Sequence, residues 1–197
     1  MAKTQSDKAA EAVARFGTTD IPDPDALWSW LASGPTEGTL LVLRRKGRLG
    51  YVSEDQLLDA LIAHGWIDGR RWVHPTDETL TLRLATPRAQ QAWSQSYKDR
   101  AERLEAEGRM APAGRAAIEE GRASGLWDFY ADVDALVVPP DLSTALGPLV
   151  GDWDLLPSSY RRNLLRWVKL AKTEPTRAKR IASIHESLRT GRRIPQM

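Results

Sequence analysis

The sequence predicts an α+β fold in which a small, mainly antiparallel sheet flanked by helices precedes a basic C-terminal helical hairpin. Residues 66–73 are expected to alternate between two faces of a strand, residues 79–84 alternate polar and apolar side chains, and a polar turn joins the two segments, which is typical of an antiparallel β-hairpin. Two amphipathic helical segments follow near the end of the chain. With 197 residues, of which 42% are hydrophobic and 27% charged, the composition is that of a globular protein.

Helix starts before the hairpin are marked by capping residues. Asp23 followed by Pro24 is a helix start, because the carboxylate can accept from free amides and proline lacks an amide to satisfy. Ser53 and Gln56 form a capping box that predicts a helix ending at Gly65. Between these helices, every residue of 40–43 is apolar, as in a short strand covered on both faces.

Glycine and proline divide the second half into further helices. Residues 90–107 and 112–124 predict a packed helical pair, and residues 158–172 and 176–189 predict the C-terminal hairpin. We therefore divide the chain into four parts. They are an N-terminal segment, 1–22, either helical or flexible; an α+β core, 23–125; an acidic connector, 126–156; and a basic helical subdomain, 157–193.

The net charge of +2 conceals a strong asymmetry along the chain. Residues 157–197 contain eleven basic and two acidic side chains, a net charge of +9, so the rest of the chain carries −7. Residues 123–156 contain six aspartates and no lysine or arginine. This separation favours docking of the two segments on each other or simple solvation, and a charged partner is the alternative.

The predicted hairpin contains the first candidate binding site. Strict alternation would place Trp66, Asp68, Arg70 and Trp72 on one face. Indoles can stack on a ligand, and guanidinium groups can bind a carboxylate or phosphate. Alternatively, Asp68 pairs with a nearby arginine and the indoles are core residues. The candidate pocket residues are Trp66, Asp68, Arg70, Arg71, Arg88 and Trp93.

The C-terminal hairpin supplies a second candidate, a basic surface. It can bind nucleic acid, an anionic membrane or acidic protein, or it can be solvated or docked on the acidic segment. Tyr160 and Trp167 are expected on the apolar side, which argues against base stacking. The basic surface consists of Arg161, Arg162, Arg166, Lys169, Arg177, Lys179 and Arg180.

Residues for catalysis or metal binding are few. The chain has no cysteine, and its three histidines lack the spacing of helical metal sites, so we expect no metal and no cofactor, although His64, His74 and Asp77 are the residue types that bind zinc. No nucleophile elbow or phosphate-binding glycine loop is present. No export signal or membrane-spanning run is visible, so the expected location is the cytoplasm.

Several ordered motifs resemble one bacterial family. They are Gly65-Trp66-Ile67-Asp68-Gly69-Arg70-Arg71, Thr86-Pro87-Arg88 with Trp93-Ser94, Glu107-Gly108-Arg109-Met110 with Pro112-Ala113-Gly114, Val138-Pro139-Pro140-Asp141-Leu142, Ser158-Ser159-Tyr160-Arg161-Arg162 with Arg166-Trp167, and the run from Lys172 to Ile181. Across residues 20–193 the chain resembles the YdeI/OmpD-associated (bacteriocin-protection) family. Tyr97 replaces the Asn usual after the Trp-Ser pair, which argues against a polar role for position 97.

The resemblance implies an α+β fold and an association with resistance to bacteriocins or antimicrobial peptides, and it implies no catalytic activity. The expected function is therefore a non-enzymatic binding or protective factor whose partner is a protein, a peptide or a small anionic ligand. A nucleic-acid-binding protein that uses the basic C-terminal helices is the alternative, and an enzyme acting on a small anion is the third hypothesis.

Overall fold

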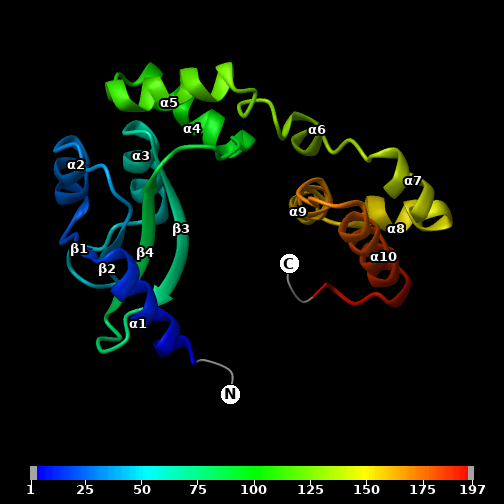
Figure 1. Cartoon of the computed structure of the whole chain (residues 1–197), viewed down its shortest axis with the longest axis horizontal. Coiled ribbons are helices and arrows are strands. Elements are labelled where there is room, and N and C mark those ends of the chain that lie inside the picture. The colour runs from blue at the N-terminus through cyan, green and yellow to red at the C-terminus, as the bar shows by residue number, and fades with distance from the viewer. Residues whose placement is uncertain (1–3, 195–197) are drawn as a thin grey trace. The chain divides into compact units, whose positions relative to one another are not determined.

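The computed structural model describes residues 4–194 and divides into two compact units, Met1–Trp127 and Asp128–Met197, which we call the N-terminal and C-terminal units (Figure 1). In the N-terminal unit the elements are α1 (Gln5–Phe16), β1 (Thr18–Asp20), α2 (Pro24–Ala32), β2 (Thr39–Arg44), α3 (Glu54–Ala63), β3 (Trp66–Val73), β4 (Leu80–Pro87), α4 (Gln95–Ala106) and α5 (Pro112–Ala123).

The four strands form one sheet in the order β1-β2-β4-β3. β4 pairs antiparallel with both β2 and β3, and Figure 1 shows the long β3–β4 hairpin. β1 pairs parallel with β2. The mixed fold with a small, mainly antiparallel sheet is therefore confirmed.

Each face of the sheet is covered by helices. On one face, α1 packs Ala9 and Ala12 against Leu40, Trp72 and Leu82. The opposite face packs against α2 and α3 in a core that consists of Ile21, Leu27, Leu31, Leu41, Leu43, Val52, Leu57, Ala60, Leu61, Trp66 and Ala85. The alternation of Leu40 and Leu41 between two buried faces explains why the strand is apolar at every position.

A β-bulge corrects the predicted alternation of β3. Asp68 pairs with Ala85, but Arg71 pairs with Arg83, so three steps along β3 match two along β4. The extra residue reverses the faces beyond Asp68. Trp66 and Asp68 consequently share a face with Arg71, and Trp72 lies on the opposite face against α1, instead of beside them.

The predicted helix caps before the hairpin are confirmed. The Asp23 carboxylate accepts from the Ala26 amide at 2.8 Å, and Ser53 and Gln56 form the capping box of α3. At the N-terminus, Thr4 and Asp7 form a further capping box, so residues 5–16 are helical rather than flexible. The short parallel strand β1 was not predicted, because three residues are too few to show a period.

Close packing joins α5 to the end of α3. Gly65 follows α3 with φ of 73°, a conformation that glycine adopts readily. A Cβ atom at Gly114 in α5 would lie 2.3 Å from the Ala63 carbonyl oxygen, so glycine is required for this approach. The amide of Ala111 donates to the same carbonyl at 3.0 Å, which fixes α5 on α3.

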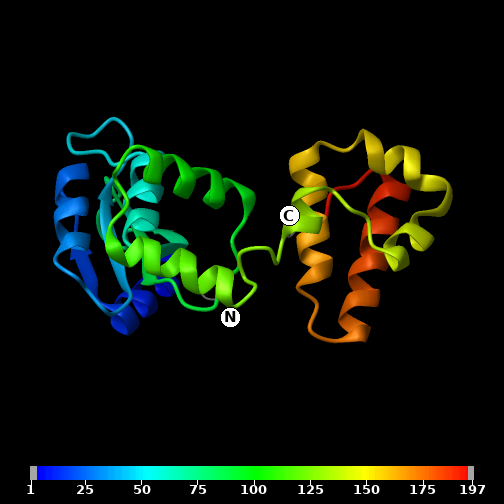
Figure 2. The ribbon, with the colours of Figure 1, turned by 90° about the horizontal axis from the view of Figure 1, so that it is seen from above.

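The C-terminal unit is helical. Its elements are α6 (Ala131–Asp134), α7 (Pro140–Leu146), η1 (Gly147–Leu149), α8 (Val150–Leu155), α9 (Ser158–Lys169) and α10 (Glu174–Thr190). Figure 2 shows α9 and α10 side by side, joined by a short turn, as the predicted hairpin requires. Residues 126–156, expected from the sequence to be a connector, contain α6 to α8. In this segment α6 packs on α9, α7 packs on α10 and α8 packs on α7, and Val133, Leu142 and Trp153 are buried.

Candidate functional site

The predicted pocket in the N-terminal unit contains two buried indoles. The Trp66 side chain packs edge-on against Trp30, with ring centroids 5.1 Å apart. Trp93 is only 1% exposed and lies against Trp127, with ring centroids 5.0 Å apart. Both indoles therefore have the packing role that the alternative interpretation describes.

Asp68 is engaged by two side chains that the sequence did not single out. Its carboxylate accepts from the Arg83 guanidinium and from the Tyr97 hydroxyl. Arg83 also donates to Glu54 at 2.7 Å. Burial, together with the hydrogen bond to Asp68, raises the pKa of Tyr97. Position 97 thus has a polar role, contrary to the prediction, because the Tyr97 hydroxyl in α4 reaches the Asp68 carboxylate in β3.

Arg88 lies between aromatic rings beside this network. Its Cζ atom is 3.9 Å from the centroid of the Trp93 ring and 5.2 Å from that of Tyr97. Its Nη1 donates to the Gln91 carbonyl at 3.1 Å, and its Nε and Nη2 atoms are buried without a hydrogen-bond partner. Burial lowers the pKa of Arg88 to about 10. The structure therefore connects Asp68, Tyr97, Arg88 and Trp93 into one packed cluster.

The two remaining pocket candidates are exposed. Arg70 lies over the Trp72 ring, with Cζ 5.4 Å from the centroid. Arg71 lines a cleft at the end of the sheet, away from the packed cluster of Arg88 and Trp93. The six predicted residues thus belong to different surroundings, because side chains alternate between the faces of β3 and the bulge shifts that alternation beyond Asp68.

In the C-terminal unit, several predicted basic residues contact the acidic segment. Arg161 pairs with Asp154 at 3.1 Å, and Lys169 pairs with Asp132 at 2.6 Å. The Nε atom of Arg162 donates to the Asp134 carbonyl at 3.3 Å. These contacts agree with the hypothesis of internal docking.

Arg177 and Arg166 are also occupied within this unit. Arg177 forms two hydrogen bonds with Asp141, at 2.6 and 2.9 Å, and these bonds lower the pKa of Asp141. Arg166 lies over the Tyr130 ring, with Cζ 4.8 Å from the centroid. Of the predicted basic surface, Lys179 and Arg180 are the two residues that these contacts with the acidic segment and with Tyr130 do not include.

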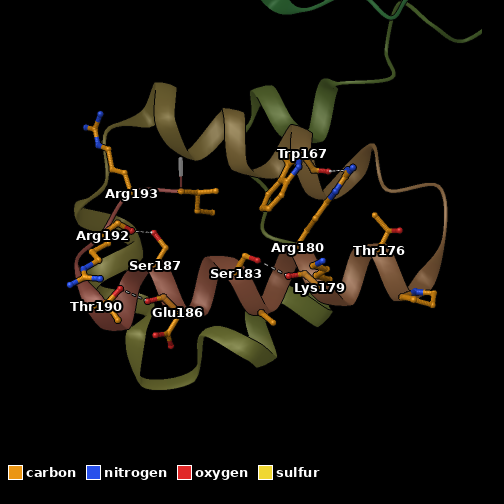
Figure 3. A pocket seen from close by; sticks show the side chains of 13 residues that line it. Trp167, Thr176, Lys179, Arg180, Ser183, Glu186, Ser187, Thr190, Arg192 and Arg193 are labelled. Carbon is orange, nitrogen blue, oxygen red and sulfur yellow. Dashed lines mark hydrogen bonds between the residues drawn. The ribbon is translucent and has the colours of Figure 1, made fainter. Parts of the chain in front are cut away.

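Lys179 and Arg180 line a groove of about 1080 Å³ beside α10 (Figure 3). Cations also come from Arg192 and Arg193, which follow the helix. The apolar part of the lining comes from α9, from the start of α10 and from the segment after α10. The other lining residues are Trp167, Pro175, Thr176, Ala182, Ser183, Glu186, Ser187, Thr190 and Ile194.

The electrostatics of the groove favour an anion. Four cations line it, and its one acid, Glu186, is paired with Arg189 at 2.7 Å. Arg193 lies over the Tyr160 ring, with Cζ 5.2 Å from the centroid, and so is held near the groove. An anionic ligand would meet a concave surface of matching charge.

Trp167 occupies a different place from the one predicted. Its side chain is half-buried and lines the groove, and the Cζ of Arg180 lies 5.3 Å from its ring centroid. Arg180 also donates to the Trp167 carbonyl, which holds the guanidinium against the indole. The helical period assigned Trp167 to the apolar side of α9. Periodicity does not show how far a neighbouring helix covers that side, and in the structure Trp167 is left half-buried at the groove.

Three of the four hydroxyls that line the groove donate within α10 or to the segment after it. Ser183 donates to the Lys179 carbonyl at 2.9 Å, Ser187 to the Arg192 carbonyl at 2.6 Å, and Thr190 to the Glu186 carbonyl at 2.8 Å, as Figure 3 shows. None of these three hydroxyls is hydrogen-bonded to a base. The groove lining can therefore hold a ligand, and these hydroxyls are not arranged as activated nucleophiles.

Metal-binding residues do not gather in the described part of the chain. Between residues 4 and 194, no group of three or more acidic or histidine side chains could hold a metal ion. The Nδ1 of His64 lies 2.9 Å from the Ala60 carbonyl, and the Nδ1 of His74 accepts from the Asp77 amide at 3.2 Å. In the same range, no helix is long and apolar enough to span a bilayer.

Two family models match separate parts of this chain. Residues 19–117, half of the chain, match the family described as a domain of unknown function (DUF8412), and the chain belongs to that family. Residues 135–191 match the family described as bacteriocin-protection, YdeI or OmpD-associated, which confirms the resemblance for the C-terminal unit. The motifs around residues 65–114, which were included in that resemblance, lie in the DUF8412 match. No curated protein and no solved structure matches the chain.

Proposed function

We propose that the protein is a non-enzymatic binding factor of the bacteriocin-protection type that uses the groove beside α10 to hold an acidic segment of a partner protein. The observation that carries this proposal is the groove itself, which is lined by four cations and by the half-buried Trp167. Ten of the thirteen lining residues lie within the region that matches the bacteriocin-protection family, and Arg192, Arg193 and Ile194 lie just after it. We also propose that the protein is located in the cytoplasm, and cell fractionation followed by detection of the protein would test this location.

A peptide suits the lining better than a continuous polyanion. Glu186 lies among the cations of the groove. A polymer with a negative charge on every unit would therefore meet one carboxylate, although Arg189 pairs with Glu186. Pro175, Ala182 and Ile194 offer apolar contacts between the charges. A peptide in which acidic residues alternate with apolar ones matches both features.

The positive charge of the groove also limits how the protein could protect a cell against antimicrobial peptides. A cationic antimicrobial peptide would be repelled by the cations of the groove, so direct capture there is disfavoured. Under this proposal, protection operates through an acidic cellular protein. The protein itself supplies a docking surface and performs no chemistry on the peptide.

Binding of a fluorescein-labelled peptide rich in Asp, Glu and Phe tests the proposal, with fluorescence anisotropy as the measurement. We expect saturable binding that weakens as salt rises, because exposed charges are screened. Replacing two exposed groove cations, in the double variant Lys179→Glu/Arg192→Glu, should weaken binding by about tenfold or more. The double variant Lys172→Glu/Arg48→Glu is the matched control, since neither residue lines the groove. Equal loss in both variants would contradict the proposal.

Nucleic-acid binding is the second candidate, and the position of Trp167 favours it. A half-buried indole in a basic groove can stack on an unpaired base, which typically contributes about 1–3 kcal/mol per base. A single-stranded oligothymidine is the probe, again with anisotropy at two salt concentrations. If the oligonucleotide binds and Trp167→Ala weakens its binding, while the acidic peptide does not bind, the second candidate replaces the first.

A further inference from the structure

The N-terminal unit contains a smaller cleft that the proposed groove function does not use. It has a volume of about 410 Å³, within the usual range for small-molecule sites. Leu43, Val52 and Leu57 contribute buried apolar surface, and Tyr51, which is 36% exposed, lies at its edge. The cleft lies where β2, β3 and β4 meet residues preceding and starting α3.

Two arginines face each other across strands in this cleft. Arg71 in β3 and Arg83 in β4 are register partners, and both line the cleft. Like charges directly opposite each other in a sheet are destabilising. Asp68 and Glu54 neutralise Arg83, but Arg71 has no ion pair among residues 4–194.

Further donors of the cleft lack acidic partners. Arg45 donates to the Glu78 carbonyl at 2.9 Å, and Lys46 forms no ion pair within the described chain. The Nε atom of Arg83 is buried and has no hydrogen-bond partner. Since Glu54 is already bound by Arg83, the cations Arg45, Lys46 and Arg71 have no ion-pair partner among residues 4–194.

We propose that this cleft binds a small organic anion, with a carboxylate or phosphate group held by Arg71 and Lys46 and an apolar body against Leu43, Val52 and Leu57. The fork of the Arg71 guanidinium suits two oxygens of either anion. Binding would give Arg71 and Lys46 the anionic partner that neither has among residues 4–194. This site is independent of the groove beside α10, so either proposal can fail without the other.

Isothermal titration calorimetry of the full chain tests the site with phenyl phosphate, benzoate and inorganic phosphate as probes. We expect phenyl phosphate or benzoate to bind saturably and inorganic phosphate to bind at least about tenfold more weakly, because it lacks the apolar body. Arg71→Ala should weaken binding of the better probe by about tenfold, the scale of one hydrogen bond between charged groups. Whichever of the two aromatic probes binds more tightly identifies the preferred head group.

Arg70→Ala is the matched control, since Arg70 is the adjacent exposed arginine and does not line the cleft. It should bind the better probe like the parent protein. Arg71→Lys should bind more weakly than the parent and more tightly than Arg71→Ala, because it keeps the charge and loses the fork. Absence of binding by both aromatic probes, equal binding of inorganic phosphate, or equal weakening by Arg70→Ala would each overturn the proposal.

Discussion

The two units use ion pairs in different ways. In the N-terminal unit, the Asp59 side chain is 11% exposed and has three arginines around it. Arg103 contacts it at 2.6 Å and Arg109 at 3.7 Å, and Arg100 donates to the same carboxylate. Asp68, 13% exposed, is likewise enclosed by Arg83 and Tyr97. Each buried carboxylate thus ties α3 or β3 to neighbouring elements.

In the C-terminal unit, three aspartates are more exposed, and each pairs with one cation. The side chains of Asp132, Asp141 and Asp154 are 50%, 42% and 65% exposed. Exposed pairs typically contribute about 0–1 kcal/mol, whereas removal of one partner from a buried pair typically costs about 3–5 kcal/mol. The comparison indicates that buried ion pairs join elements of the first unit, while in the second unit exposed pairs join the acidic segment to α9 and α10.

The largest effect that this comparison predicts is at Asp59. Asp59→Ala would leave Arg100 without its buried carboxylate, and we expect the free energy of unfolding to fall by about 3 kcal/mol. Urea unfolding followed by tryptophan fluorescence measures it, since six of the eight tryptophans lie in the N-terminal unit.

Asp55→Ala is the control for Asp59. Asp55 lies on the same helix and contacts the same Arg100 at 2.8 Å, but its side chain is 85% exposed. We expect a loss of less than about 1 kcal/mol. A loss as large as that of Asp59→Ala would show that burial does not separate the two kinds of ion pair.

A smaller effect is predicted for the packing of α5 on α3. In Gly114→Ala, the new Cβ would meet the Ala63 carbonyl carbon and oxygen, and the helices must separate. Such overpacking typically costs about 1–3 kcal/mol, and thermal unfolding measures the change. In the C-terminal unit, a Cβ atom added at Gly151 in α8 would meet nothing within 4 Å, so Gly151→Ala should leave stability unchanged or slightly higher. Equal destabilisation would contradict the packing argument.

The smallest effect concerns acid pH in the C-terminal unit. Because the pKa of Asp141 is lowered by Arg177, its contribution is present above the ordinary pKa and is lost as pH falls through the lowered value. At neutral pH, Asp141→Asn should be less stable than the parent by about 0.5 kcal/mol, and the two should converge in acid. Hydrogen exchange of α10 amides between pH 7 and pH 3 measures the difference, with exposed Asp152→Asn as control. A constant difference over this range would contradict the assignment.

The candidate sites show where sequence reasoning succeeded and where it could not. The bulge after Asp68 has one sequence signal, Gly69, which is consistent with a bulge but does not locate the extra residue. Tyr97 meets Asp68 from a helix 29 residues later, and no local pattern connects the two. The residues predicted as a basic surface divide into docked cations, such as Lys169 and Arg177, and groove-lining cations, Lys179 and Arg180, and this division depends on which acids fold against them.

The sequence by itself determined the helix caps, the β-hairpin and the opposite charges of the acidic and basic segments, because these follow from contacts between residues close together in the chain. The family match of the C-terminal region was also readable from ordered motifs. Only the tertiary structure decided that Trp72 and Trp66 lie on opposite sheet faces and that Trp167 lines a groove. Those placements depend on long-range packing, which one inserted residue or one neighbouring helix can change without altering the local pattern.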